Sequence, residues 1–327
     1  MEAPERNLAL DLVRVTEAAA LNSARWLGKG NKEEGDRAAV DAMRLSFNAL
    51  DIQGKVIIGE GEKDQAPMLF NGEELGTGRG PKVDVAVDPV EGTNLLAFGR
   101  PNAISVIGVA PAGMMYDPGP SFYMQKLVVP AAAKDVVHLD APVKENLMRI
   151  AKALDKDVDD LVVFVLDKPR HKKLIEEIRR AGARIELHTD GDVAGSLMAI
   201  DPRSNVDVMM GTGGTPEGVL SACAIRAMGG EMLARLDPRS KAEEGALMDA
   251  GMDIRDILTV KTLVKTDDVY FAATGISGGT FLNGVRYTGN GAVTHSLVMR
   301  GKTGCIRFVE AHHSFDKLML FSSVKYD

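Results

Sequence analysis

The residues best suited to chemistry lie between Val83 and Thr93, where the sequence reads VDVAVDPVEGT. Side chains alternate along a strand, so Asp84 and Asp88 would share one face of it. Two carboxylates on one face repel each other strongly unless cations neutralise them. The segment therefore predicts a strand whose acidic face attracts cations.

The turn after this strand would complete a cluster of oxygen ligands. Pro89 cannot donate a hydrogen bond to a neighbouring strand, so we expect it to stop the strand pairing. Gly92 permits a sharp turn that would swing Glu91 and Thr93 back toward Asp88. Hard cations such as Mg²⁺ and Mn²⁺ prefer oxygen ligands of this kind. The alternative is an acidic strand end followed by an ordinary turn.

A second acidic cluster follows another apolar run. Residues 55–58 lead into Glu60 and Glu62, which share a face if the backbone stays extended. The glycines beside them allow another chain or a ligand to come close. Asp36 opens a predicted helix further upstream. A solvated acidic loop is the ordinary alternative for the glutamates, and Asp36 could be an ordinary first-turn carboxylate.

The second half of the chain supplies cations. Lys168, Pro169 and Arg170 follow directly after the apolar run 161–166, which we expect to be a strand. The rigid proline would hold a point charge and a forked guanidinium at the edge of the sheet, where both suit phosphate oxygens. A basic helix start is the ordinary alternative, but it opposes the helix dipole.

Two further loops fall between predicted strands and helices. The turn Asp190-Gly191-Asp192 could cap the next helix or accept hydrogen bonds from sugar hydroxyls. Backbone N–H groups of the loop at residues 211–218 could receive an anion. That loop lacks the Lys-Ser or Lys-Thr end of a Walker A motif. No histidine pair has helical metal-ligand spacing, and the inventory of carboxylates, a threonine hydroxyl and two cations favours metal-assisted phosphoryl transfer to water.

Hydrophobic periodicity predicts the elements that position these residues. Alternation of strand and helix from about residue 141 is typical of an α/β fold, and we place a junction near residue 140 between halves 1–140 and 141–327. We predict helices at 6–27, 35–50, 143–154, 171–181, 192–200 and 216–228. We predict strands at 55–59, 83–88, 103–110, 161–166, 184–187, 206–210, 268–273, 293–299 and 304–311.

Composition narrows the class of protein. The 327 residues carry 39 Lys and Arg against 46 Asp and Glu, which argues against a nucleic-acid binder. No uncharged apolar run approaches the length that spans a bilayer, and the acidic start of the chain does not resemble a signal peptide. Cys223 and Cys305 lack the spacing of a zinc or redox pair, so we expect reduced core thiols. We expect a cytoplasmic enzyme without membrane or nucleic-acid partners.

The motifs together resemble a known family. Asp88-Pro89-x-Glu91-Gly92-Thr93 resembles the metal-binding signature of the lithium-sensitive sugar and inositol phosphatases. The wider set is similar to the bacterial class II fructose-1,6-bisphosphatases, and the resemblance extends from about Arg6 to residue 315. The motifs of this wider set are IGEGE at 58–62, KPRH at 168–171, DGDVA at 190–194 and GGTPEG at 213–218.

The resemblance implies a layered α-β-α-β-α fold, classed as α/β, and hydrolysis of the 1-phosphate of fructose 1,6-bisphosphate with Mg²⁺ or Mn²⁺, a gluconeogenic step. It implies that Thr93 orients or activates the attacking water, supported by Asp64 and Glu62. The implied metal ligands are Asp36 and Glu60 for one ion, and Asp88, Glu91 and Glu217 for another. The implied substrate-binding residues are Glu91, Gly92, Thr93, Tyr123, Lys168, Pro169, Arg170, Asp190, Gly191, Asp192 and Gly214. The basic residues around the distal phosphate are only partly identifiable.

Several alternative functions stay open. Some relatives within the class also accept sedoheptulose 1,7-bisphosphate, and inositol or nucleotide monophosphatases share the acidic signature. A sugar-phosphate sensor without turnover would need no group that activates a nucleophile, so Thr93, Asp64 and Glu62 argue against it. A nucleotide-binding module built on the glycine loops is a third possibility. We expect a homo-oligomer, either a dimer or a tetramer.

Overall fold

The computed structural model describes residues 7–61, 68–321 and 324–326. The chain forms two compact units, each described here by itself. The first unit comprises Met1–Ala112 and Asp268–Asp327, and the second comprises Gly113–Asp267. This division differs from the predicted single junction near residue 140. The reason is that β11 (Tyr270–Gly275) pairs with β4 (Ile104–Pro111), and the strands that follow β11 join the same sheet.

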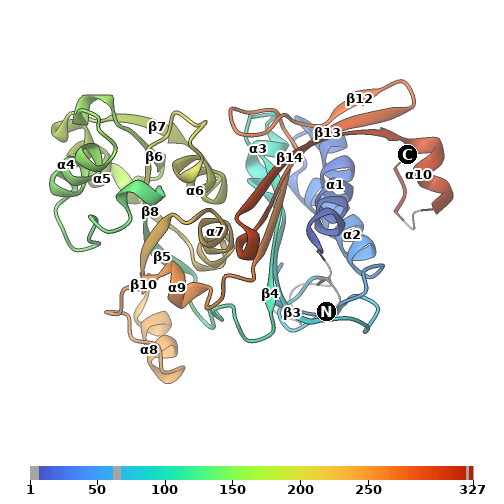
Figure 1. Cartoon of the computed structure of the whole chain (residues 1–327), viewed down its shortest axis with the longest axis horizontal. Helices are drawn as coiled ribbons and strands as arrows, with labels where there is room; N and C mark the ends of the chain where they lie inside the picture. The colour runs from blue at the N-terminus through green and yellow to red at the C-terminus, as the bar shows by residue number, and fades with distance from the viewer. Residues whose placement is uncertain (1–6, 62–67, 322–323, 327) are drawn as a thin grey trace. The chain divides into compact units, whose positions relative to one another are not determined.

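The first unit is built on a mixed sheet in the order β12-β13-β11-β4-β3-β1-β2, with β14 paired to β13 (Figure 1). Helices α1 and α2 pack together and cover it, burying Leu12, Met43 and Phe47 against strand residues such as Val85 and Ile107. Each such side chain contributes about 1.5–3 kcal/mol by leaving water. The strands are β1 (Gln53–Ile58), β2 (Glu74–Leu75), β3 (Lys82–Glu91), β4 (Ile104–Pro111), β11 (Tyr270–Gly275), β12 (Arg286–Thr288), β13 (Gly291–Arg300) and β14 (Cys305–Ser314). The helices are α1 (Ala9–Ser23), α2 (Lys32–Phe47), α3 (Thr93–Ala97) and α10 (Phe315–Phe321).

The second unit has its own mixed sheet in the order β10-β9-β5-β8-β6-β7 (Figure 1). Helices α4 and α5 bury one face, and α6 and α7 approach the other face closely through Gly195 and Gly218. The strands are β5 (Tyr123–Val129), β6 (Val162–Leu166), β7 (Arg184–His188), β8 (Val208–Gly214), β9 (Glu231–Leu236) and β10 (Leu258–Thr259). The helices are α4 (Val143–Ala153), α5 (Lys172–Ala181), α6 (Asp192–Ile200), α7 (Thr215–Met228), α8 (Lys241–Asp249) and α9 (Val260–Leu263).

The predicted α/β class is correct, and each predicted helix and strand overlaps an observed element. The prediction that Pro89 stops β3 is wrong. The strand continues to Glu91, because a register shift between Asp88 and Glu91 lets it pass the proline and pair again with Ile104. Cys223 is buried in α7 as expected, whereas Cys305 is only half-buried at the start of β14. None of the described helices is long and apolar enough to cross a membrane.

Candidate active site

In the first unit, acidic side chains gather at one edge of the sheet. Strands β1 and β3 run parallel, with Ile58 beside Ala86, so their carboxyl ends meet at the same edge. Glu60 follows β1. Asp88 and Glu91 lie at the end of β3, beyond that pair. In open α/β sheets this is the edge where ligands bind.

The loop that carries Glu60 is closed tightly on its neighbours. The N–H of Gly59 donates to Asn71 Oδ1 at 3.1 Å, and the N–H of Glu60 donates to the Leu69 carbonyl at 3.0 Å. A β-carbon at Gly59 would lie 1.9 Å from that Leu69 oxygen, so only glycine fits there. These contacts fix the backbone of Glu60. The predicted catalytic residues Glu62 and Asp64 lie outside the described residues.

The sharp turn predicted at Gly92 is present. Gly92 has φ 89°, in the left-handed region, and α3 begins at the next residue, Thr93. Before the turn, Asp88 Oδ1 accepts a hydrogen bond from the Val90 N–H at 3.0 Å, and Glu91 is buried. The sequence thus places Thr93 at the start of a short helix, directly after the acidic end of β3.

Asp36 lies in the second turn of α2, because the helix begins at Lys32 with Asn31 as its N-cap. The ordinary first-turn interpretation of Asp36 is therefore wrong. Next to it, α2 packs closely against α3, since a β-carbon at Gly35 would lie 2.6 Å from Leu96 Cδ2. Burial raises the pKa of Asp36 to about 6. A charged form of this carboxyl is costly at this position unless a cation accompanies it.

In the second unit, the predicted substrate-binding residues meet at one edge of the other sheet. Strands β6, β7 and β8 run parallel, and β5 begins where β8 ends, with Tyr123 directly beside Gly214. Lys168 follows β6 and donates to Asp190 Oδ1, which follows β7, at 2.9 Å. Pro169 begins a 3-10 turn that ends at His171. The structure thus brings four separate motifs together.

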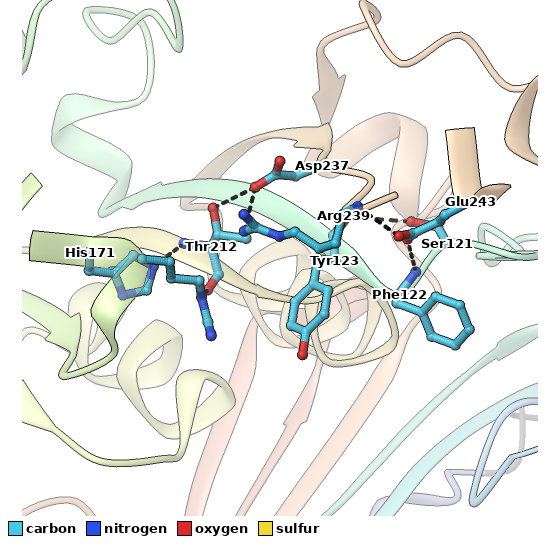
Figure 2. A network of polar contacts seen from close by, with 9 residues as sticks. Ser121, Phe122, Tyr123, His171, Thr212, Asp237, Arg239 and Glu243 are labelled. Atoms are coloured by element: carbon cyan, nitrogen blue, oxygen red, sulfur yellow. Dashed lines mark hydrogen bonds and ion pairs between the residues drawn. The ribbon is translucent and has the colours of Figure 1, made fainter. Parts of the chain in front are cut away.

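A hydrogen-bond network fixes Arg170 beside β8, and Figure 2 shows its members His171 and Thr212. Arg170 Nε donates to the Thr212 carbonyl at 2.9 Å, and the Thr212 N–H donates to His171 Nε2 at 2.8 Å. His171 Nδ1 lies 2.7 Å from the Leu166 carbonyl, so the ring satisfies both contacts only as the neutral Nδ1–H tautomer. Burial lowers the pKa of His171, which favours the same neutral form. His171 therefore has a positioning role.

Sequence reasoning missed Arg239. The guanidinium carbons of Arg239 and Arg170 each lie 5.4 Å from the centre of the Tyr123 ring. Arg239 Nη2 donates to Asp237 Oδ2 at 2.7 Å, and the same oxygen accepts the Thr212 hydroxyl at 3.0 Å (Figure 2). Asp237 and Arg239 follow β9, a strand that we did not predict. A basic residue just after an alternating apolar run, as in MLARLDPR, is the signal that could have identified it.

Sequence reasoning also missed Lys126, a buried lysine inside β5. Only 1% of its surface is exposed, and its Nζ lies 2.6 Å from Asp192 Oδ2. Asp192 is itself buried and its carboxylate pairs with Lys126, whereas Asp190 is partly exposed and pairs with Lys168. Gly191 is the N-cap of α6, which argues against the alternative that the two aspartates cap this helix. The lone lysine in the run YMQKLVV was the available signal.

Glu217 lies next to this ion pair, and glycines provide the space for both. A β-carbon at Gly214 would lie 1.7 Å from Glu217 Oε2, and one at Gly213 would lie 1.7 Å from Asp192 Oδ2. Glu217 Oε2 is buried and has no hydrogen-bond partner among the described residues. Burial, and then the charge of Asp192, raises the pKa of Glu217, while Lys126 lowers it. A buried carboxylate oxygen without a donor is suited to a cation.

The predicted metal ligands are divided between the units, with Glu217 in the second and the others in the first. Within residues 7–61, 68–321 and 324–326, no group of three His, Cys, Asp or Glu side chains comes together as a metal site. The individual donors nevertheless fit a hard divalent cation. They are all carboxylates, the pKa values of Asp36 and Glu217 are raised by burial, and Glu217 Oε2 lacks a partner in the described part of the chain.

Comparison with known proteins gives the family. The chain matches the family described as bacterial fructose-1,6-bisphosphatase, glpX-encoded, over residues 6–313. It is 43% identical to fructose-1,6-bisphosphatase 1 class 2 of Escherichia coli strain K12 over 325 residues, which cover 95% of this chain and 96% of the relative. The class 2 enzyme of Shigella flexneri is similar to the same extent, at 43% identity over 95% of this chain and 96% of its own length. The chain therefore belongs to the family of bacterial, glpX-encoded fructose-1,6-bisphosphatases.

Proposed function

We propose that the protein hydrolyses the 1-phosphate of D-fructose 1,6-bisphosphate to give fructose 6-phosphate and phosphate, a gluconeogenic step. One observation carries the proposal. Family membership extends over nearly the whole chain, and in each unit the family's motifs lie at the edge of the sheet where ligands bind. The carboxylates at the edge in the first unit suit metal ions, and the cations at the edge in the second unit suit phosphate oxygens.

We assign the divalent ion to Mg²⁺ or Mn²⁺. Asp36 and Glu60 would hold one ion, and Asp88, Glu91 and Glu217 would hold another. When bound, such ions neutralise the phosphate charge and lower the barrier to attack by water. Two observations support these assignments: Glu217 Oε2 has no hydrogen-bond partner among the residues that the structure describes, and burial raises the pKa of Asp36.

The side chains of this protein would then divide the remaining work. The Thr93 hydroxyl orients or activates the attacking water, and Glu62 and Asp64 support it as acid, base or ligand. Lys168 and Arg170 bind phosphate oxygens, because an ammonium and a forked guanidinium donate charge-assisted hydrogen bonds to them. A larger set of residues would contact the sugar through side chains or backbone, namely Glu91, Gly92, Tyr123, Pro169, Asp190, Gly191, Asp192 and Gly214.

Three broader properties belong to the same proposal. We place the protein in the superfamily of lithium-sensitive sugar and inositol phosphatases, on the basis of the Asp88 to Thr93 signature. We place it in the cytoplasm, as a metabolic enzyme acting on a sugar bisphosphate. We also infer a homo-oligomer, a dimer or a tetramer, which size-exclusion chromatography with light scattering would measure.

A panel of substrates tests the activity directly. Phosphate release should be measured from fructose 1,6-bisphosphate, sedoheptulose 1,7-bisphosphate, inositol 1-phosphate and a nucleoside monophosphate, each with Mg²⁺ or Mn²⁺. We expect the highest kcat/KM with fructose 1,6-bisphosphate, and phosphorus NMR should show that fructose 6-phosphate is formed. A higher kcat/KM with sedoheptulose 1,7-bisphosphate or a monophosphate would replace the proposed substrate with that compound.

A further inference from the structure

Tyr123 has two guanidinium groups beside its ring. The guanidinium carbons of Arg170 and Arg239 each lie 5.4 Å from the ring centre, and both side chains are exposed to solvent. An aromatic ring attracts such cations, so it holds two like charges close together without an ion between them. Figure 2 shows Arg239 beside Tyr123, next to the Thr212 network.

The backbone around Arg239 is fixed to the strand that carries Tyr123. The buried carboxylate of Glu243 accepts the Phe122 N–H at 3.0 Å on one oxygen and the Arg239 N–H at 2.8 Å on the other. Glu243 in turn lies in the first turn of α8, whose N-cap Ser240 accepts the Glu243 N–H. One carboxylate therefore sets the positions of Arg239 and of the start of β5 together.

Charges and donors near the ring favour an anion. Lys168 pairs with Asp190 and Arg239 pairs with Asp237, while Arg170 adds a third positive charge beside Tyr123, so these cations exceed the carboxylates that pair with them. Arg170 uses Nε for the Thr212 carbonyl, and Arg239 uses one terminal nitrogen for Asp237. The two terminal nitrogens of Arg170 and the second terminal nitrogen of Arg239 can donate to a phosphate, which accepts several such bonds at once.

We propose that Arg239 is a specificity-determining residue that, together with Arg170 across Tyr123, binds the phosphate of the bisphosphate that is not hydrolysed. The inference rests on the proposed function, because it assigns the distal phosphate of that substrate. The hydrolysed phosphate is left to the acidic edge and its cations. Asp237 and Thr212 hold the Arg239 guanidinium toward the ring, so Arg239 is oriented before the substrate binds.

The test compares Arg239→Met with a matched control, Arg203→Met. Both arginines belong to an Asp-Pro-Arg tripeptide and donate from Nη2 to the aspartate two residues earlier at 2.7 Å, but only Arg239 lies beside Tyr123. Arg239→Met should raise KM for fructose 1,6-bisphosphate by about 10- to 100-fold with kcat little changed, because the contact is equally strong in the ground and transition states. Activity toward fructose 1-phosphate, which lacks the distal phosphate, should stay at the level of the unmodified protein. Arg203→Met should change neither substrate's KM.

Binding of fructose 6-phosphate gives a second readout that needs no turnover. This product keeps the distal phosphate, so calorimetry should show weaker binding to Arg239→Met and unchanged binding to Arg203→Met. An unchanged KM and unchanged product affinity in Arg239→Met would overturn the inference, as would equal losses with fructose 1-phosphate. If the unmodified protein does not hydrolyse fructose 1,6-bisphosphate, the proposed function itself fails. If Arg239→Met has a lower melting temperature than the unmodified protein, Arg239→Gln is measured in its place, and the same results support or overturn the inference.

Discussion

Replacing Lys126 by methionine would keep much of the side-chain volume and remove the buried positive charge. Asp192 would lose its ion-pair partner and Glu217 would lose the described lysine that lowers its pKa, although Asp192 is buried and Glu217 Oε2 is enclosed. Removing one partner of a buried ion pair costs about 3–5 kcal/mol. A domain of this size melts about 2–4 °C lower for each kcal/mol lost, so the melting temperature should fall by roughly 6–20 °C.

Two further variants separate the charge effect from general damage. Lys156→Met removes a lysine of the same unit that pairs with Asp207, but 40% of that lysine side chain is exposed, so the loss should be about 1 kcal/mol. The double variant Lys126→Met/Asp192→Asn removes both charges of the buried pair, and it should recover part of the lost stability. Calorimetric melting of metal-free protein at pH 7 measures all three. Equal losses in Lys126→Met and Lys156→Met would refute the reasoning, and so would a double variant less stable than Lys126→Met.

Three other outcomes can be measured with the same preparations. Thr93→Ala should lower kcat by about 10²–10⁴-fold while costing only on the order of 1 kcal/mol of stability, and a variant with more than about a tenth of normal kcat would remove Thr93 from catalysis. Treatment with a chelator should abolish phosphate release, and Mg²⁺ or Mn²⁺ should restore it; full activity in metal-free buffer would contradict the metal assignment. Glu17, buried beside Thr294 and His313, has its pKa raised by burial from 4.5 to about 7, so its contribution to stability is complete below pH 4.5 and is lost as the pH rises through 7. The free energy of unfolding of Glu17→Gln, relative to that of the unmodified protein, should therefore rise by up to about 3 kcal/mol as the pH increases from 5 to 8. Urea unfolding at both pH values measures this difference.

Local patterns in the sequence predicted much of the first unit's edge. Alternation in VDVAV identifies β3, and Gly92 marks the left-handed turn before Thr93, because both features depend only on neighbouring residues. Pro89 was misjudged for a non-local reason. A proline ends pairing unless a register shift carries the strand past it, and here Pro89 and Val90 of β3 lie opposite the single residue Ser105 of β4.

The division into units could not be predicted from a change of rhythm along the chain. The second unit is inserted between β4 and β11, which pair directly, with Tyr270 beside Val109. The chain passes from one unit to the other twice, after Ala112 and after Asp267. These two points follow and precede neighbouring strands of one sheet, but they are far apart in the sequence. The sequence-based junction near residue 140 falls inside the second unit, because β5 was missed and α4 was the first regular element recognised after it.

The same limitation explains why the second unit's most informative charges escaped notice. Lys126 and Arg239 each look like isolated basic residues in sequence, because Asp192, the partner of Lys126, is 66 residues away, and Tyr123, beside which Arg239 lies, belongs to another strand. Pairing of β5 with both β8 and β9 brings Tyr123, Gly214 and the residues after β9 to one edge. A buried cation that balances two carboxylates and an exposed guanidinium aimed at a ring are therefore consequences of strand order. A motif search finds the residues at strand ends, and strand order decides which of them can act on the same phosphate.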